Sequence, residues 1–398
     1  MRILIFTEIY DSGGIDTFII NLINNWPETN DEFILISNED YPGLINIKNR
    51  VSKSVSFQGY KNKDFLSKTQ YSLTYKLLSL LLSPFYFINY VLYFYAYFNK
   101  YSYETMLVVN GGYPGGIKCI AASIASKLSN FNAKNIHNVH NLAQKKQLHS
   151  FIQEYFLDLM LTLAVDDFVT VSNAAAKSFN SSSRLFNSNI SFIYNGISEE
   201  KLSEQYDHNL LKNLKISNDD RLCLMLATFE KRKGHEFLLR SFVEVIAKIP
   251  SAKLLMSGFG LPYEKEYVES LVKELNLSNN VVISDFQSDI DTLIRRASFL
   301  VLPSQSYESF GYVLVEAMLR KKPTIGTNIG GIPEVIVNNS TGYIVQKNHI
   351  SLMAERIITL LTNKELSIKF GENGYRVFIN KFTAKKMSSS YYKLINNQ

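Results

Sequence analysis

Residues 300–318 read LVLPSQSYESFGYVLVEAM, a short apolar run, a polar loop and a second, longer apolar run. The first run, Leu300–Leu302, is predicted to be a buried strand that ends in the Pro-Ser pair. The second run begins at Phe310 or Gly311 and is predicted to be a helix that continues to Lys321. A strand followed directly by a helix is the unit from which parallel sheets are built.

The same alternation of short apolar runs and longer helical patterns recurs along the chain. Predicted strands lie at Ile3–Phe6, Phe33–Ser37, Met106–Val109, Lys134–Val139, Phe168–Val171 and Ser191–Ile193, and then at Leu222–Leu226, Ala252–Met256, Val281–Ser284, Leu300–Leu302 and Pro323–Gly326. Predicted helices include Thr17–Asn25, Glu236–Ala247, Tyr263–Leu275 and Thr383–Leu394. Because strands alternate with helices in two series, we predict an α/β fold with two doubly wound, Rossmann-like domains.

The length of the chain and the polar stretch SEEKLSEQYDHNLLKN at residues 198–213 predict how it divides into domains. At 398 residues the chain exceeds what one ordinary core fills, which predicts about two domains. We predict a first domain over residues 1–198, a second over 199–378 and a C-terminal helix over 379–398. Because doubly wound sheets bind ligands at the carboxyl ends of their strands, we expect the two domains to face each other across an interdomain cleft.

The composition is that of a globular, mildly basic protein, with 46% hydrophobic and 20% charged residues. The formal net charge of +6 suits an anionic small molecule or a negatively charged membrane surface. No basic tract of the kind that binds nucleic acid is present. Cys119 and Cys223 lie far apart in apolar segments, so we predict buried thiols in the reducing cytoplasm. The opening MRILIFTEIY predicts a buried strand rather than a secretory signal.

An uncharged segment, residues 77–98, is long enough to cross a bilayer as a helix. Its sequence, LLSLLLSPFYFINYVLYFYAYF, is rich in Tyr and Phe, which favour the membrane interface, and contains Pro84 and Asn89. Lysines flank it on both sides: Lys61, Lys63, Lys68 and Lys76 before it and Lys100 after it. We favour a pair of interfacial helices, followed by a buried domain helix and then by a true span. The favoured interpretation predicts a peripheral protein on the inner face of the cell membrane.

Two motifs in the first half place small or polar residues directly after predicted strands. Gly13 and Gly14 lie where the first strand meets the first helix, and glycine there lets a ligand approach free helix N–H groups. A tight turn is the alternative. His137 lies within a predicted strand and is predicted to be a core histidine. His140 and Asn141 fall at the exit of that strand, where ligands bind, and are the better functional candidates.

In the second half, residues 227–235 read ATFEKRKGH and connect a predicted strand to a predicted helix. Three consecutive cations repel one another unless they are solvated or neutralised. They form either a solvated charge run or a diphosphate site, in which Arg232 and Lys233 supply the charge and helix N–H groups assist. Gly258 follows the next strand and permits a nucleotide to approach the backbone.

The sequence Asp289-Ile290-Asp291 has the form of a metal-binding Asp-x-Asp motif. It opens a predicted helix, where acids cap the free N–H groups, and we interpret it as a cap. No other cluster of His, Cys or carboxylate residues in the sequence has ligand spacing. We therefore predict no required metal and no other cofactor.

The two glutamates of the opening stretch, Glu308 and Glu316, stand before and within the predicted helix. Eight helical residues rise about 12 Å. A nucleotide-sugar has a similar length, so the two carboxylates could hold hydroxyls at its two ends while the helix N-terminus faces phosphate. The alternative is a helix-end acid followed by an exposed glutamate. Apolar neighbours predict that Glu316 is at least half buried, and a buried carboxylate needs partners.

With these motifs in this order, the chain resembles the retaining GT-B glycosyltransferases of family four, the group 1 type of bacterial surface-polysaccharide biosynthesis. The strongest feature is the E-x7-E pair within PSQSYESFGYVLVEAM. Further matching segments are Gly13-Gly14, His140-Asn141, Ser172, Tyr194-Asn195-Gly196, Arg232-Lys233-Gly234-His235, Gly330-Gly331-Ile332-Pro333-Glu334 and Thr341-Gly342-Tyr343. One departure is Ala227-Thr228, which stands where the family often has Gly-Arg, and Arg232 is the candidate to replace that arginine.

The resemblance implies roles for the matched residues. Lys233 is similar to the lysine that holds the diphosphate and stabilises the leaving group, and Glu308 to the glutamate near the donor sugar. Glu316 resembles the glutamate that binds the ribose diol, and His140 the histidine that contacts the sugar. These implied roles make Glu308, Lys233 and His140 the predicted catalytic residues. The predicted donor site also includes Arg232, Phe310, Gly311, Glu316, Gly14, Thr228 and Gly258, and the predicted acceptor site includes Gly13 and Asn141.

The resemblance further implies a metal-independent glycosyltransferase that moves a sugar from a UDP- or GDP-linked donor to a glycan or lipid-linked acceptor with retention of configuration. The first domain would bind the acceptor and the second the nucleotide-sugar. The aromatic segment fits an acceptor held at a membrane, such as a polyprenyl-linked glycan. The alternatives are a nucleotide-sugar epimerase-like enzyme, which needs no acceptor, and a non-catalytic nucleotide-sugar-binding protein.

Overall fold

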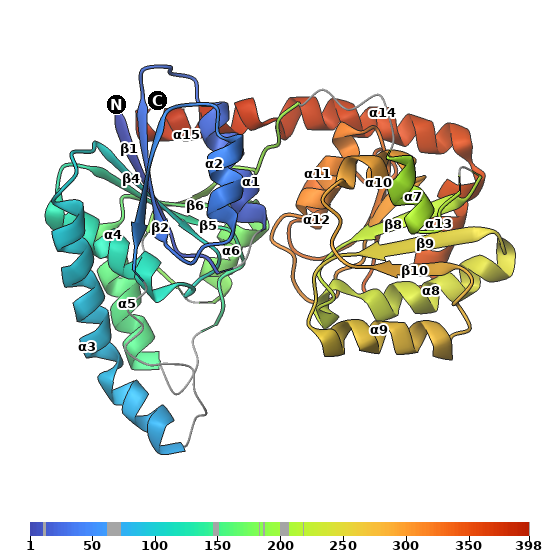
Figure 1. The fold of residues 1–398 in the computed structure, drawn as a ribbon, viewed down its shortest axis with the longest axis horizontal. Helices are drawn as coiled ribbons and strands as arrows, with labels where there is room; N and C mark the ends of the chain where they lie inside the picture. Colours follow the sequence, from blue (N-terminus) through green and yellow to red (C-terminus); the bar gives the residue numbers. More distant parts are fainter. Residues whose placement is uncertain are drawn as a thin grey trace. The chain divides into compact units, whose positions relative to one another are not determined.

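The chain forms two compact units, Met1–Asn195 together with Ala384–Gln398, and Gly196–Thr383 (Figure 1). We call them the N-terminal unit and the C-terminal unit, and each has its own sheet and its own buried core. The computed structural model describes residues 1–10, 13–61, 73–145, 151–182, 184–185, 188–199, 207–217 and 219–397, with the backbone alone for 73–83.

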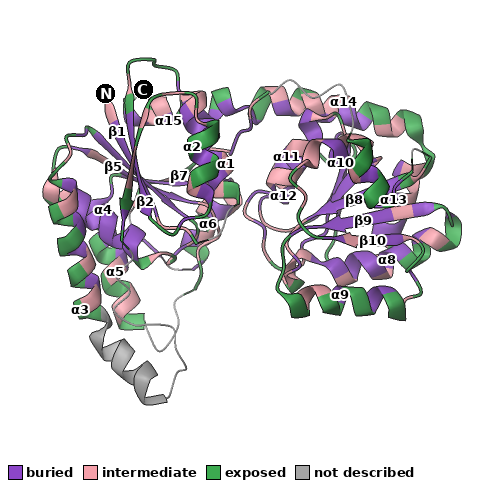
Figure 2. Cartoon of the chain, viewed as in Figure 1, coloured by how far each residue is buried: buried purple, intermediate pink, exposed green. Residues whose placement is uncertain are grey.

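The N-terminal unit is built on a seven-stranded parallel sheet with the order β3-β2-β1-β4-β5-β6-β7. Its strands are β1 (Arg2–Thr7), β2 (Glu32–Asn38), β3 (Val55–Tyr60), β4 (Thr105–Asn110), β5 (Lys134–Val139), β6 (Asp167–Thr170) and β7 (Ile190–Phe192). Its helices are α1 (Gly14–Asn24), α2 (Gly43–Arg50), α3 (Leu73–Phe98), α4 (Ile117–Ser129), α5 (Phe151–Ala164), α6 (Asn173–Ser181) and α15 (Ala384–Ile395). The central strands are apolar and buried beneath these helices (Figure 2), as expected for a parallel sheet.

The C-terminal unit has a six-stranded parallel sheet with the order β10-β9-β8-β11-β12-β13. Its strands are β8 (Arg221–Leu226), β9 (Ala252–Ser257), β10 (Val281–Ser284), β11 (Phe299–Leu302), β12 (Thr324–Thr327) and β13 (Gly342–Val345). Its helices are α7 (His208–Asn213), the short 3-10 helix η2 (Lys231–Lys233), α8 (His235–Lys248), α9 (Pro262–Glu274), α10 (Ile290–Arg296), α11 (Tyr312–Leu319), α12 (Ile332–Val335), α13 (Ile350–Thr362) and α14 (Lys364–Lys381).

The two sheets confirm the predicted α/β fold with two doubly wound, Rossmann-like domains. Two strands, β3 and β13, were not predicted. β3 reads VSFQGY, lies at the edge of its sheet and is half exposed, so it lacks the apolar run that marks a buried strand. β13 reads GYIV and is only four residues long, beginning with a glycine that β12 requires, because a Cβ on Gly342 would lie 1.9 Å from the Thr324 carbonyl oxygen.

The aromatic-rich segment lies within one continuous helix, α3, which passes through Pro84. The predicted pair of helices is therefore wrong. The described part of α3 packs one face into the core of the N-terminal unit, through Phe87, Val91, Phe94 and Phe98. Aromatic residues occupy its buried and its exposed face alike, so the pattern of apolar residues does not indicate which face is buried. Among the described residues, no helix is both long and apolar enough to cross a membrane.

The C-terminal helix α15 belongs to the N-terminal unit, although α14 just before it belongs to the other. α14 extends to Lys381, so the first residues of the predicted terminal segment belong to it. Tyr391 of α15 packs edge-on against Phe18 of α1, and its hydroxyl accepts a hydrogen bond from the Asn138 amide at 2.8 Å. The Ser388 hydroxyl donates to the Leu22 carbonyl oxygen at 3.0 Å. These contacts tie the end of the chain to its beginning.

His137 in β5 is a fully buried core histidine, as predicted from its place within the strand. Its Nδ1 lies 2.8 Å from the Ser123 hydroxyl and its Nε2 3.3 Å from the Asn110 amide. Burial lowers the pKa of His137 to about 3. Burial, with a smaller contribution from Lys233, lowers the pKa of His235 in α8 to about 4. Both rings are therefore neutral in the folded protein at neutral pH.

We predict that the free energy of unfolding falls as the pH is lowered from about 6.5 towards 4. Below the ordinary histidine pKa of about 6.5, the unfolded chain binds protons that the folded rings do not, and stability is lost. Urea unfolding of the whole chain between pH 7 and pH 5 measures the slope. His137→Asn should reduce it, whereas His208→Asn, at an exposed position of α7, should leave it unchanged. Equal slopes in the two variants would contradict the assignment.

Candidate active site

Two loops of the C-terminal unit leave neighbouring strands at the point where the strand order turns. Within the sheet, β8 has β9 as its neighbour on one side and β11 as its neighbour on the other. Residues 227–233 follow β8, and residues 303–311 follow β11. In doubly wound sheets, ligands bind in the crevice outside the carboxyl ends of the strands at this switch point. The loop 303–311 therefore lies at the position where this architecture binds a ligand.

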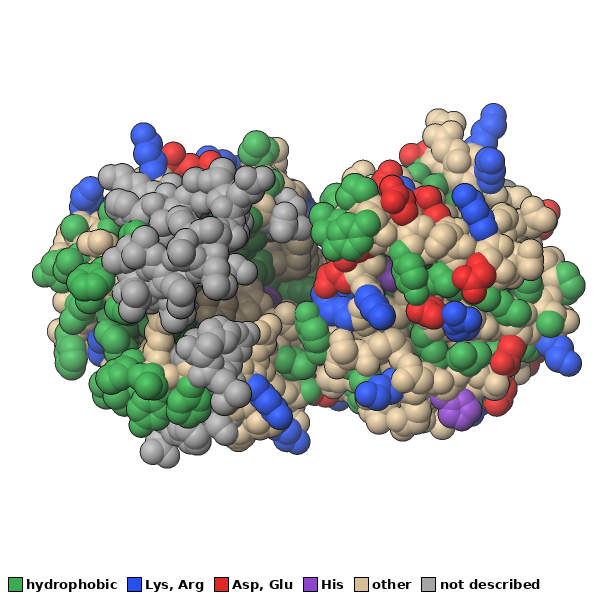
Figure 3. All heavy atoms as spheres, turned by 90° about the horizontal axis from the view of Figure 1, so that it is seen from below, with side chains coloured by type: hydrophobic (Ala, Val, Ile, Leu, Met, Phe, Trp, Pro, Cys, Tyr) green, Lys and Arg blue, Asp and Glu red, His purple; other side chains and the backbone are tan. Residues whose placement is uncertain are grey.

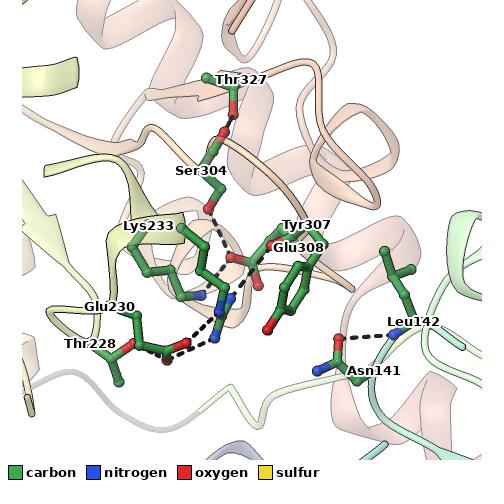
Figure 4. Close-up of polar contacts among 10 residues, drawn as sticks. Asn141, Leu142, Thr228, Glu230, Lys233, Ser304, Tyr307, Glu308 and Thr327 are labelled. Carbon is green, nitrogen blue, oxygen red and sulfur yellow. Dashed lines mark hydrogen bonds and ion pairs between the residues drawn. The ribbon is translucent and has the colours of Figure 1, made fainter. Parts of the chain in front are cut away.

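A buried ion pair joins the two loops. The Lys233 ammonium lies 2.6 Å from Oε2 of Glu308, which also accepts a hydrogen bond from the Ser304 hydroxyl at 3.0 Å (Figure 4). Glu308 is only 8% exposed, and the Lys233 side chain only 13%. A carboxylate this deeply buried needs a cation or several donors, and here it has both. The structure thus brings together two of the three predicted catalytic residues.

A second cluster surrounds Glu230 in the loop after β8 (Figure 4). Its carboxylate accepts hydrogen bonds from Arg232 Nε at 2.6 Å and Nη2 at 2.9 Å, and from the Thr228 hydroxyl at 2.7 Å. Burial opposes ionisation of Glu230, but these hydrogen bonds outweigh it and lower the pKa of the carboxyl. The Arg232 guanidinium also lies over the Tyr307 ring, 4.5 Å from its centroid. The three consecutive cations are therefore not simply a solvated charge run, since two of them are paired within the protein.

Glycines let the backbones around Glu308 approach closely. Gly330 has φ +55°, and a Cβ there would lie 1.9 Å from the Glu308 carbonyl oxygen. The same oxygen accepts a hydrogen bond from the Gly331 N–H at 2.9 Å. Gly234 has φ +82°, and a Cβ there would lie 2.1 Å from the Pro303 carbonyl oxygen. Glycine at these positions therefore fixes where the carboxylate and its lysine meet.

Helix α11 begins after Gly311, which caps it at φ +89°, in agreement with the predicted start. Phe310 is 2% exposed and its ring packs against Phe382, so its side chain belongs to the core of the unit. The Glu316 side chain is 18% exposed, which confirms the predicted half-burial, and lies 2.5 Å from Arg320 Nη1. Arg320 in turn lies 2.7 Å from Asp291. A ribose would therefore have to share the Glu316 carboxylate with this arginine.

The Asp-x-Asp sequence is used by the protein itself. Asp289 caps α10, where its Oδ1 accepts a hydrogen bond from the Thr292 N–H at 2.9 Å, as predicted. Asp291 pairs with Arg295 at 2.8 Å as well as with Arg320. Across the part of the chain that the structure describes, no group of three or more His, Cys, Asp or Glu residues could hold a metal ion.

Gly258 follows β9, and a Cβ there would lie 1.9 Å from the Ala227 carbonyl oxygen. The close approach of the segments after β8 and β9 therefore requires glycine at this position, whether or not a ligand binds there. Beyond it, the exposed rings of Phe259 and Phe286 stack with centroids 4.4 Å apart. The two phenylalanines follow the adjacent strands β9 and β10 at the carboxyl edge of the sheet.

The remaining predicted residues lie in the N-terminal unit, at the carboxyl ends of β1 and β5. Gly13 caps α1 and Gly14 opens it; their neighbours Asp11 and Ser12 lie outside the described residues. The His140 ring packs edge-on against Phe18, with centroids 4.6 Å apart. Its Nε2 is buried and has no hydrogen-bond partner among the described residues. Burial lowers the pKa of His140 to about 3, so the ring is neutral at pH 7.

The side-chain oxygen of Asn141, Oδ1, already accepts a hydrogen bond from the Leu142 N–H at 2.9 Å (Figure 4). Ser304, Glu230 and Tyr307 hold the predicted residues in place and are not predicted by the sequence. Their side chains are common in loops, and no spacing distinguishes them. The predicted interdomain cleft stays a prediction.

The comparisons with known proteins agree with this geometry. Residues 207–377 match the family model of the glycosyl transferases group 1. The N-acetyl-alpha-D-glucosaminyl L-malate synthase of Bacillus anthracis is 31% identical over 205 residues, 52% of this chain and 53% of that protein. The match therefore spans about half the length of this relative. The capsular polysaccharide biosynthesis glycosyltransferase CapM of Staphylococcus aureus is 29% identical over 291 residues, 71% of this chain and 74% of that protein.

Among solved structures, Anabaena Alr3699/HepE in complex with UDP superposes with a TM-score of 0.78 at 18% identity, covering 100% of both chains. A glycosyltransferase from Rickettsia africae superposes with a TM-score of 0.79 at 21% identity, covering 100% of this chain and 98% of that chain. Two parallel Rossmann-like sheets with these neighbours define a GT-B fold. Residues 207–377, which lie within the C-terminal unit, therefore form a glycosyl transferases group 1 domain.

We predict that Gly330→Ala separates Glu308 from Lys233 and lowers the free energy of unfolding by about 2 kcal/mol or more. An alanine with φ +55° is strained, and its Cβ would overlap the Glu308 carbonyl oxygen, so the loop after β11 must shift. Thermal unfolding measures the loss of stability. Gly111→Ala is the control, because a Cβ there meets only Ile15 at 3.7 Å. Equal unfolding midpoints for both variants would show that the close contact does not position Glu308.

Proposed function

We propose that the chain is a retaining, metal-independent glycosyltransferase that moves a sugar from a nucleoside diphosphate sugar to a glycan or lipid-linked acceptor. The observation that carries this proposal is the Lys233–Glu308 pair at the switch point of the C-terminal sheet. An ammonium held beside a carboxylate at a ligand-binding edge can address two ends of one substrate. The cation suits the diphosphate and the carboxylate suits sugar hydroxyls.

The donor proposal rests on two further supports. The structural neighbour Alr3699/HepE was solved with UDP and with UDP-glucose. In this chain, the stacked and exposed pair Phe259–Phe286 offers an aromatic surface at the same sheet edge as Thr228 and Glu230, suited to a nucleobase. We assign the base to this surface, the ribose to Glu316 and the diphosphate to Lys233. Thermal shift with UDP and with GDP distinguishes uracil from guanine as the base.

Lys233 would act on the leaving group. Breaking the bond between sugar and diphosphate places negative charge on the departing phosphate, and a fixed cation in a partly buried site lowers the energy of that charge. On binding, the phosphate would share the Lys233 ammonium with Glu308. Arg232 is held at Glu230 and over Tyr307, so a diphosphate would have to draw it away from Glu230. We therefore give Lys233 the larger role and Arg232 a supporting one.

The metal independence that we propose rests on this chain's own charges. Lys233 and Arg232 provide two cations, and α8 begins immediately after Lys233-Gly234 with free N–H groups. Together they can stabilise a leaving diphosphate, which is the task that a divalent cation would otherwise perform.

His140 would contact the donor sugar as a neutral ring. Its Nε2 is buried without a partner, and such a group costs free energy unless a ligand hydroxyl satisfies it. A neutral imidazole can donate or accept one hydrogen bond at this atom, according to its tautomer. Gly13, Gly14 and Asn141 lie on the same edge of the N-terminal sheet and are the proposed neighbours of the sugar and the acceptor.

Retention of configuration would follow from transfer on one face of the sugar, with the leaving phosphate taking the proton of the acceptor hydroxyl. We place the protein in the cytoplasm, peripheral on the inner face of the cell membrane through α3, where a lipid-linked glycan would be its acceptor. The CapM relative is named for capsular polysaccharide biosynthesis, which supports an acceptor of this class. An epimerase-like enzyme or a non-catalytic binding protein would need no acceptor, so nucleoside diphosphate released only when an acceptor is added excludes both.

We predict that Lys233→Ala lowers kcat about 100-fold, which corresponds to about 3 kcal/mol of lost transition-state stabilisation, with a smaller effect on donor binding. The charge that Lys233 stabilises is greatest when the sugar–phosphate bond breaks. Release of nucleoside diphosphate measures kcat, and thermal shift with UDP- and GDP-sugars measures donor binding. Lys231→Ala is the matched control, since Lys231 is exposed in the same short helix. Equal turnover in both variants would place the reaction elsewhere.

We predict that the product keeps the anomeric configuration of the donor, and that a chelator does not reduce the rate. NMR of the newly formed glycosidic bond gives the configuration, and the same reaction with excess EDTA tests the metal. An inverted product would contradict retention. Loss of activity in EDTA, restored by Mg²⁺ or Mn²⁺, would contradict metal independence.

A further inference from the structure

Helix α5 of the N-terminal unit turns an apolar face outward. Its exposed side chains are Phe151, Ile152, Phe156, Leu159, Met160 and Leu163, together with Tyr155. They recur every three to four residues and so form one stripe along the helix. Ile152 and Leu163, near the two ends of the stripe, are each 74% exposed. In an ordinary surface helix this stripe would be polar.

The charged residues of α5 point the other way. Glu154 and Asp158 both pair with Arg184, which is only 1% exposed. Asp158 also accepts a hydrogen bond from the Tyr113 hydroxyl at 2.6 Å. Because its acids are used inside the unit, the exposed face of α5 carries no charge. Such a contiguous apolar patch on a surface marks an interaction site.

Helix α3 adds a second apolar face beside it. Both α3 and α5 pack on α4, and the exposed side chains of the described part of α3 include Phe85, Ile88, Leu92, Tyr93 and Tyr95. No exposed residue of α3 from Pro84 to Phe98 is charged. Figure 3 shows hydrophobic side chains gathered on the face of the N-terminal unit that is seen from below. We call the exposed apolar residues of α3 and α5 the docking face.

An exposed lysine lies in the connection that precedes each helix. Lys61 is exposed at the end of β3, ahead of α3, and Lys145 is exposed ahead of α5. Each helix returns from the carboxyl edge of a parallel sheet, so both connections leave from that edge. Cations beside an uncharged face rich in Tyr and Phe complement an anionic lipid surface.

We propose that α3 and α5 together dock the protein on an anionic phospholipid bilayer, with α5 lying in the interface. α5 has 14 residues, about 21 Å, which is too short to span a bilayer and suits a helix that lies along its surface. The proposed function places the protein at the membrane through α3 alone; this proposal adds α5 as a second docking helix and specifies that the lipid is anionic. Its link to a lipid-linked acceptor rests on the proposed function, whereas the docking itself does not.

This arrangement would bring the acceptor to the site. His140 and Asn141 follow β5 directly, and residues 142–150 connect them to Phe151, the first residue of the α5 stripe. The proposed sugar-contacting residues are thus close in sequence to the docking face. A glycan carried by a lipid would reach them from the bilayer without the lipid leaving it.

Flotation of the full chain with vesicles tests the docking. We expect binding to vesicles of equal parts phosphatidylcholine and phosphatidylglycerol, weaker binding to phosphatidylcholine alone, and weakening by salt. Ile152→Glu with Leu163→Glu should reduce binding at least about tenfold, because both charges enter the apolar interface. Ile368→Glu is the control, since this exposed residue lies on α14 of the other unit and should not affect binding.

Two results would overturn the inference. If the α5 double variant binds vesicles like the unaltered chain, α5 is not part of the docking face, even where Leu92→Glu on α3 reduces binding. If the unaltered chain is a dimer and the double variant a monomer, with vesicle binding equal in both, a second copy covers α5. Thermal shift with UDP and GDP, measured on each variant, checks that the protein is folded. It also separates a failure of docking from a failure of the proposed donor site.

Discussion

The candidate site depends on one buried ion pair, Lys233 with Glu308, which joins two loops from neighbouring strands. Neither charge would be stable at this depth without the other, so the fold has to deliver both to the same point. Parallel strands achieve this because β8 and β11 end at the same edge. Gly234 and Gly330 then remove the side chains that would keep the backbones apart. The pair is thus the product of sheet order and of two residues without a Cβ.

The cations of the site are already paired with carboxylates of the protein, and this pairing determines how the site would respond to a ligand. Lys233 is already neutralised, and so are Arg232 by Glu230 and Arg320 by Glu316 and Asp291. A bound diphosphate or ribose would therefore exchange one partner for another instead of filling bare charges. Such exchange costs less reorganisation than burying an unpaired ion and holds the side chains near their working positions.

The sequence predicts most of the sheet architecture, because β8 and β11 have apolar runs bounded by polar loops. It also predicts that Lys233 and Glu308 lie in loops that follow strands and that α11 starts at Gly311. It does not predict that Glu316 pairs with Arg320, because the position of Arg320 also depends on Asp291 of α10, which is distant in the sequence. It fails on the shape of α3, where Phe and Tyr occupy buried and exposed faces alike. Half-exposed β3 carries too little apolar signal to be recognised.

The end of the chain completes the unit that its beginning starts. Tyr391 and Ser388 of α15 pack on α1, so the N-terminal unit lacks part of its core until α15 is present. The C-terminal unit, in contrast, is encoded by one continuous stretch. During synthesis it can therefore close before the N-terminal unit does, although it is made later. The N-terminal unit therefore becomes complete only after the whole of the C-terminal unit has been synthesised.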